Sequence, residues 1–119
     1  MSKTRQPTRD SGPFISGEVP LPFTVKFDPT DINFTGFSLE ATMHSHLEVE
    51  MPFGGSVTWF DEVTGVVQVE FASNDLLLAA GVEHEDRKLM VWTGDGTNLV
   101  ATVVIKVPID AAIGTPPSI

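Results

Sequence analysis

The pattern of apolar and polar residues in the segment 86–107 is that of two β-strands joined by a tight turn. In the second half of this segment the odd-numbered positions are all apolar and would share one face of a strand. They are Leu99, Ala101, Val103, Ile105 and Val107. A period of two is typical of a β-strand, because successive side chains of a strand point to opposite faces of its sheet. Residues 93–97 contain two glycines and an aspartate, which suit the backbone angles of a tight turn. The pattern predicts a central, mostly buried β-hairpin.

A second alternating segment extends over residues 37–51. Its odd positions are apolar except for Ser45, and we expect them to face the core while the polar even positions face water. The apolar residues are Phe37, Leu39, Ala41, Met43, Leu47, Val49 and Met51. An unbroken strand over these residues would be about 50 Å long, which exceeds the size of a small domain. We therefore expect a bend or bulge near residues 44–46. Shorter alternating runs predict further strands at residues 21–27, 56–60 and 66–71.

Residues 73–81 differ from the predicted strands around them. Residues of the helix-capping type begin this segment, helix-forming residues follow and Gly81 ends it, so it predicts one or two helical turns that cross between sheets. About seven short strands separated by turn residues indicate an all-β sandwich over residues 21–108. Proline and glycine recur in residues 1–20 and 109–119, where we expect an extended N-terminal arm and a flexible C-terminal tail.

The charge of the chain is uneven. The net charge is −9, yet Lys3, Arg5 and Arg9 lie within the first nine residues, so the remainder carries four basic and sixteen acidic residues, a formal −12. Such an acidic domain repels phosphate backbones, and we expect no nucleic-acid partner. The basic segment could bind an acidic neighbour, including a second copy of the chain, or remain a solvated tail.

Length and composition narrow the class of protein. A chain of 119 residues is the size of one domain. Because the chain contains no cysteine, a disulfide scaffold, a thiolate metal site and a cysteine nucleophile are excluded. No segment has the apolar run of a signal peptide or of a membrane span. We expect a soluble protein without a membrane partner.

Two histidines are the main candidates for metal chemistry. His44 and His46 would share one strand face that Glu48 continues, and such a pair could ligate zinc or iron; the other interpretation is a polar, exposed face. His84 lies among three carboxylates and could be a pH-sensitive contact or part of a solvated loop. The sequence has no nucleophile elbow, phosphate-binding loop or dinucleotide fingerprint. We expect neither catalysis nor a bound cofactor.

Three aromatic residues are candidates for contact with a partner. Trp59 and Phe60 are adjacent in a predicted strand and cannot both face one core, so one should point outward, where it would mark a protein interface. Trp92 lies in the predicted hairpin, and we expect it in the core or between the sheets. Alternatively, Trp59 or Trp92 forms a stacking platform for a sugar.

Five segments of the chain share their order and spacing with one known family. They are Phe23-Thr-Val-Lys-Phe27, Asp31-Ile-Asn-Phe-Thr-Gly-Phe-Ser-Leu-Glu-Ala41, Thr64-Gly-Val-Val-Gln-Val-Glu-Phe71, the connector at 73–81 and Leu89-Met-Val-Trp-Thr-Gly-Asp-Gly96. Taken in this order, they resemble the immunoglobulin-like N-terminal module of upper-baseplate proteins of tailed bacteriophages. The resemblance covers about residues 21–108 and implies an immunoglobulin-like β-sandwich. Two features depart from it: Val82 stands where the family has an aromatic residue, and the chain contains no tyrosine.

The resemblance implies a stand-alone, non-enzymatic structural module of a virion, in the tail, baseplate or neck. Its partners would be other virion proteins, with several copies on a symmetric particle. The terminal arms, with Lys3, Arg5 and Arg9, would attach the module, and Trp59 or Phe60 would add a contact. The alternatives are a capsid decoration or cement protein, a carbohydrate-binding adhesion module, and a metal-dependent enzyme built on the histidines at 44 and 46.

Overall fold

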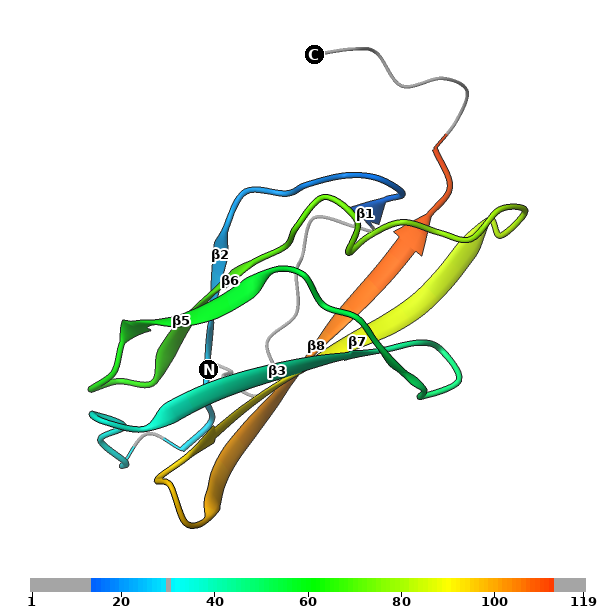
Figure 1. The fold of residues 1–119 in the computed structure, drawn as a ribbon. Helices are drawn as coiled ribbons and strands as arrows, with labels where there is room; N and C mark the ends of the chain where they lie inside the picture. Colours follow the sequence, from blue (N-terminus) through cyan, green and yellow to red (C-terminus); the bar gives the residue numbers. More distant parts are fainter. Residues whose placement is uncertain (1–13, 30, 113–119) are drawn as a thin grey trace.

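The computed structural model describes residues 14–29 and 31–112, which form two β-sheets packed face to face (Figure 1). One sheet has five strands, in the order β1 (Phe14–Ile15), β8 (Leu99–Asp110), β7 (His84–Gly94), β3 (Ser38–His44) and β4 (Glu50–Met51). The other has three strands, in the order β2 (Phe23–Lys26), β6 (Val66–Glu70) and β5 (Ser56–Asp61). The described residues include no helix. The fold is all-β, as expected.

The strand order is that of an immunoglobulin-like sandwich. In that fold strands B, E and D share one sheet, and strands C, F and G form the other, which variable-type domains extend beyond C. Strands β2, β6 and β5 take the places of B, E and D, while β3, β7 and β8 take those of C, F and G, with β4 next to β3. Strand β1 runs parallel to β8. The predicted fold class is confirmed, with eight strands in place of about seven.

The core lies between the two sheets. Strands β7 and β8 form the predicted hairpin and pair from His84 with Asp110 to Gly94 with Leu99. The inward side chains of these two strands that are buried and apolar are Leu89, Val91, Val103, Ile105, Val107 and Ile109. Leu99 departs from its predicted face and is 59% exposed. A bulge between Thr93 and Gly94 shifts the strand register at the tip of the hairpin. Leu99 therefore pairs with Gly94, whose position faces away from the second sheet.

The bend expected near residues 44–46 is confirmed. Strand β3 ends at His44, and the chain turns back into β4 with a hydrogen bond from the Ser45 backbone N–H to the Val49 carbonyl at 2.9 Å. In this turn Glu48 has a left-handed φ of 62°. Leu47 and Val49 were expected in the core but are 71% and 61% exposed. The apolar alternation does not indicate a strand at these two positions, because both residues lie in the turn between β3 and β4.

Both boundaries expected for the sandwich domain are corrected by the structure. Phe14, in the range expected to be an extended arm, is fully buried, and β1 pairs with Ile109 and Asp110 of β8. Those two β8 residues lie in the range expected to be a flexible tail. The edge contact between residues far apart in sequence therefore brings residues 14–20 and 109–112 into the domain. The basic residues Lys3, Arg5 and Arg9 lie outside the described residues.

The connector between β6 and β7 contains turns in place of the predicted helical turns. The nearly buried carboxylate of Asp75 accepts hydrogen bonds from the backbone N–H groups of Gly54 and Ala72, each at 2.7 Å. The polar residues that were interpreted as a helix cap therefore cap a turn. This arrangement places Leu76, which is fully buried, against the core.

Candidate functional site

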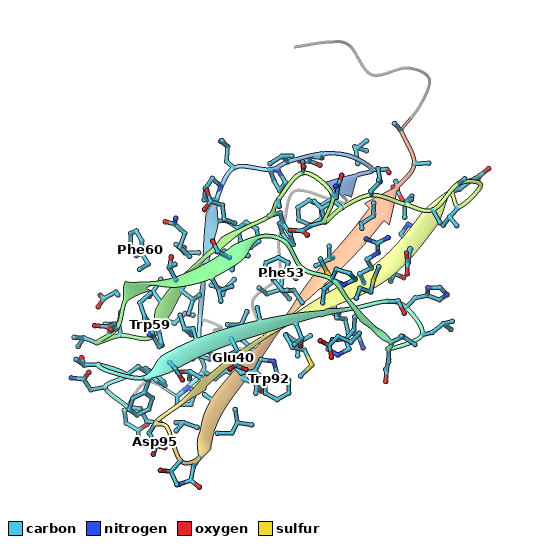
Figure 2. The ribbon with its side chains drawn as sticks, viewed as in Figure 1. Glu40, Phe53, Trp59, Phe60, Trp92 and Asp95 are labelled. Carbon is cyan, nitrogen blue, oxygen red and sulfur yellow. The ribbon has the colours of Figure 1, made fainter. Side chains whose placement is uncertain are left out.

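Trp92 lies on the outer face of the five-stranded sheet. On β7 the inward positions are Arg87, Leu89, Val91 and Thr93, all buried, so the residues between them point away from the second sheet (Figure 2). The expectation that Trp92 lies in the core or between the sheets is therefore wrong. Both parities of β7 contain large apolar residues, so alternation alone does not identify the parity that the second sheet covers.

The neighbours of Trp92 on this face are polar. Glu40 on β3 and Thr102 on β8 lie directly opposite Trp92 in the two strand registers, and opposed side chains of adjacent strands are in reach of each other. The indole Nε1–H group donates a hydrogen bond to Oγ1 of Thr42 at 3.3 Å. This bond and the two flanking strands hold the ring in place.

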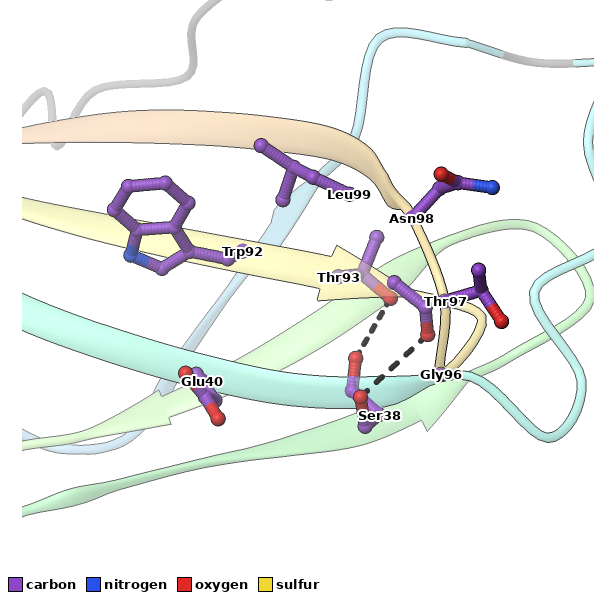
Figure 3. A pocket seen from close by; sticks show the side chains of 9 residues that line it. Ser38, Glu40, Trp92, Thr93, Gly96, Thr97, Asn98 and Leu99 are labelled. Carbon is purple, nitrogen blue, oxygen red and sulfur yellow. Dashed lines mark hydrogen bonds between the residues drawn. The ribbon is translucent and has the colours of Figure 1, made fainter.

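A hollow of about 250 Å³ opens between Trp92 and the tip of the β7–β8 hairpin (Figure 3). The next position on the same face of β7 is Gly94, which has no side chain to fill this space. A Cβ atom at Gly94 would lie 2.7 Å from the carbonyl oxygen of Asn98, so the bulge itself requires glycine. The other side chains that form the walls include Ser38, Glu40, Thr97, Asn98 and Leu99.

Hydrogen bonds within the tip give the hollow a defined shape. The Asp95 carboxylate accepts the backbone N–H groups of Thr97 and Asn98 at 2.9 and 2.8 Å. The bonds from Asn98 and Thr97 lower the pKa of Asp95, because they stabilise its charged form. Across the sheet, the Thr93 hydroxyl donates to the Ser38 carbonyl at 2.8 Å. The arrangement offers an aromatic ring, a carboxylate, hydroxyl groups and an amide around one open space.

The second tryptophan has a different environment. Trp59 is partly buried and stacks on Phe34, with ring centroids 5.6 Å apart, and its Nε1–H group donates to the Phe37 carbonyl at 2.9 Å. Phe60, the next residue, is 66% exposed (Figure 2). The prediction that one member of this pair points outward is confirmed, and the outward residue is Phe60. Its role in an interface stays a prediction.

The two histidines considered as metal ligands do not continue one strand face. His44 ends β3 and lines a separate hollow with Glu48, Lys88 and Met90, whereas His46 lies in the following turn. The Nδ1 atom of His46 is 3.0 Å from Oε2 of Glu85. Among residues 14–29 and 31–112, no group of three or more His, Cys, Asp or Glu side chains is placed to hold a metal ion.

His84 lies between two carboxylates at the other end of the hairpin. Its Nδ1 atom is 2.5 Å from Asp110 and its Nε2 atom is 2.9 Å from Asp86. The hydrogen bonds with Asp110 and then with Asp86 raise the pKa of His84 above its usual 6.5, because they favour the charged imidazolium. The sequence pointed to the carboxylates adjacent to His84 along the chain. Pairing of β7 with β8 supplies Asp110, which no local pattern indicates.

A buried arginine near His84 was not identified from the sequence. Arg87 is 4% exposed and donates to the backbone carbonyls of Asp75 and Leu77 at 3.0 and 2.7 Å, and to Oε1 of Glu85 at 3.0 Å. Burial would raise the pKa of Glu85, but hydrogen bonds from His46 and Arg87 outweigh it and lower that pKa. The one sequence signal for its burial is that Arg87, a charged residue, shares its face of β7 with the apolar residues Leu89 and Val91. The network joins the connector to the hairpin.

Comparison of the chain with protein-family models, curated proteins and solved structures gave no significant match. In the part of the chain that the structure describes, no helix is long and apolar enough to cross a membrane. Inference about function therefore depends on the resemblance noted in the sequence and on the surfaces described above.

Proposed function

We propose that this chain is a non-enzymatic structural module of a bacteriophage particle, in the tail, baseplate or neck. The observation that carries the proposal is the immunoglobulin-like strand order, formed by the same residues whose sequence resembles the upper-baseplate module. Many unrelated functions use such sandwiches, so the fold supports the proposal only together with that resemblance. The module would act by contact with other virion proteins.

The N-terminal segment is the attachment element that we infer. Lys3, Arg5 and Arg9 precede Phe14, the first residue of β1. A basic segment joined to an acidic domain can bind an acidic neighbour without any change in the domain, and a second copy of the chain is itself acidic. Repetition on a symmetric particle would turn weak single contacts into firm attachment.

Phe60 is the second contact that we infer. It lies on β5, at the edge of the three-stranded sheet, and Val63 in the next turn is also exposed. An aromatic side chain that stays in water in the isolated domain favours burial in an interface. Trp59 contributes indirectly, because its packing in the core holds β5 in place.

Deletion of residues 1–13 tests this proposal. The deletion stops before Phe14, because removing residues 1–20 would take away a fully buried core side chain and cost about 3–5 kcal/mol. We expect the shortened protein to keep its thermal midpoint and to be lost from purified particles, as measured by quantitative immunoblotting. Wild-type incorporation of the shortened protein would contradict attachment through this segment.

A charge variant is the matched control for the deletion. Replacing Lys3, Arg5 and Arg9 by glutamine keeps the length of the segment and removes its positive charge. If electrostatic attraction drives attachment, this variant should also be absent from purified particles. The wild-type protein should then dissociate from particles increasingly as the salt concentration rises. Normal incorporation of the glutamine variant would assign attachment to the segment's other residues.

A capsid decoration or cement protein is the alternative within the same class. Gold-labelled antibodies on purified particles separate the two locations. Label at the tail, baseplate or neck supports the proposal, and label over the head supports the decoration protein. Particles without any label would contradict a virion role altogether.

A further inference from the structure

We propose that the hollow beside Trp92 is a binding site for a neutral hexose, free or as the exposed unit of a glycan. The site is independent of the attachment role proposed above, since it uses neither the N-terminal segment nor Phe60. The proposal depends on three properties of the hollow: an available aromatic ring, polar groups around it, and the sign of its charge.

The aromatic ring is the first property. The Trp92 side chain lies on the outer face of the sheet, between the strand positions of Glu40 and Thr102, and lines the open space together with Leu99 (Figure 3). The C–H groups on one face of a pyranose ring form an apolar surface that packs well against an indole. Trp59 cannot serve in this way, because its ring packs against Phe34 and Phe27 in the core.

The polar walls are the second property. Glu40, Thr97 and Asn98 line the hollow and are exposed, and they supply a carboxylate acceptor, a hydroxyl group and an amide. A sugar ring stacked on Trp92 has its hydroxyl groups at its edge, where these side chains can exchange hydrogen bonds with it. The combination of one apolar platform and several edge contacts suits a sugar better than a fully apolar ligand.

The charge of the walls selects the class of sugar. Glu40 lines the hollow and Asp95 lies in the turn beside it, whereas none of the described lining residues is Lys or Arg. A sugar carboxylate, sulfate or phosphate would therefore meet repulsion without a counter-charge. Uncharged hexoses and N-acetylated hexoses avoid this repulsion.

The hollow is already formed without a ligand. Gly94 leaves the space open, and hydrogen bonds of Asp95, Thr93 and Trp92 hold the walls. A preformed site loses little conformational entropy on binding. One sugar ring makes few contacts, however, so we expect a dissociation constant of about 1 mM for a monosaccharide.

The two indole N–H signals of the ¹⁵N-labelled protein give a direct test. The chain contains two tryptophans, so each signal can be assigned by one substitution. Methyl β-glucoside, methyl β-galactoside and N-acetylglucosamine are titrated separately, with glucuronate as the anionic control. We expect the Trp92 signal to move in a saturable way with at least one neutral sugar, while the Trp59 signal stays in place and glucuronate has no effect.

Three variants locate the binding. Trp92→Ala should weaken binding by about tenfold or more, seen in the backbone signals of residues 94–99, and Glu40→Gln should weaken binding less while removing the discrimination against glucuronate. Phe60→Ala, which removes an exposed aromatic ring elsewhere, should bind as the wild type does. Thermal midpoints show whether each variant is folded; because Trp92 is on the outer face, its replacement should leave the fold intact.

Two results would overturn the proposal. One is the lack of a saturable shift of the Trp92 signal with any of the three neutral sugars up to about 100 mM, roughly 100 times the expected dissociation constant. The other is an equal shift of both indole signals, which indicates non-specific contact. Neither result bears on particle attachment, which the deletion of residues 1–13 tests separately.

Discussion

The two ends of the β7–β8 hairpin are stabilised in different ways. At one end Arg87 joins the hairpin to the connector through backbone carbonyls, His84 bridges β7 to Asp110 on β8, and β1 adds an edge contact. At the other end the tip projects from the sandwich (Figure 1), and the bonds within the turn are mainly its own, those of Asp95.

The contrast shows where binding can be accommodated without loss of the fold. A region joined to many other segments cannot change its side chains freely, because each one satisfies a group elsewhere. The tip is less constrained, since Trp92 and the turn residues contact solvent on one side. We therefore expect substitutions at the Arg87 end to change stability and substitutions at the tip to change binding.

The largest effect is expected for Arg87→Met. Methionine can replace the aliphatic part of the side chain, but it leaves the carbonyls of Asp75 and Leu77 without this donor, and the nearly buried Glu85 keeps only its bonds with His46. Loss of one member of such a buried pair costs about 3–5 kcal/mol. Urea denaturation measures the free energy of unfolding.

Lys88→Met is the matched control for Arg87→Met. Lys88 is the next residue and is half-exposed, with a long 3.8 Å contact to Glu48. We expect a loss of less than about 0.5 kcal/mol. Equal losses for the two variants would contradict the view that burial and carbonyl contacts distinguish Arg87.

A smaller effect is expected for Asp75→Ala. The substitution leaves the partly buried backbone N–H groups of Gly54 and Ala72 without this acceptor, and such groups are costly when they have no partner. We expect a loss of about 2–3 kcal/mol in urea denaturation. The exposed neighbour Asn74, replaced by alanine, is the control and should show little change. If Asp75→Ala leaves the free energy of unfolding unchanged, the connector adopts its turns without this side chain.

The smallest effect is expected for His84, and it should depend on pH. Because the pKa of His84 is raised in the folded protein, its contribution to stability is fully present below the unfolded pKa and is lost as the pH rises through the folded pKa. His84→Gln should therefore lower the thermal midpoint more at about pH 5 than at about pH 9. Asp110→Asn should reduce this pH dependence, since Asp110 is the main cause of the shift. The same difference in thermal midpoint between wild type and His84→Gln at every pH from about 5 to about 9 would contradict this role of His84.

Much of the fold could be predicted from the sequence, because strand alternation is a local property. The β7–β8 hairpin, the bend after β3 and the two-sheet class follow from period-two patterns and turn residues. Phe14 could not be placed in the same way. Its strand has two residues, and its burial depends on pairing with Ile109, almost the whole chain away.

The candidate site shows the same limit. Alternation along β7 separates Leu89 and Val91 from Met90 and Trp92, but it does not show which set faces the second sheet. Which face is covered depends on the total apolar surface that the two sheets bury together. The observed packing also buries Arg87, whose charge is compensated by backbone carbonyls of the connector. The bulge at Gly94, which opens the hollow and turns Leu99 outward, is likewise a property of two paired strands.

The sequence by itself therefore determined the elements of this protein: the strands, the turns, the acidic domain and the lack of cysteine chemistry. These features depend on neighbouring residues or on composition, which the chain carries in any conformation. The tertiary structure alone decided that Trp92 faces outward, that Arg87 is buried and that Phe14 belongs to the core. Each of these depends on contacts between residues distant in sequence, whose energies exist only once the two sheets have packed together.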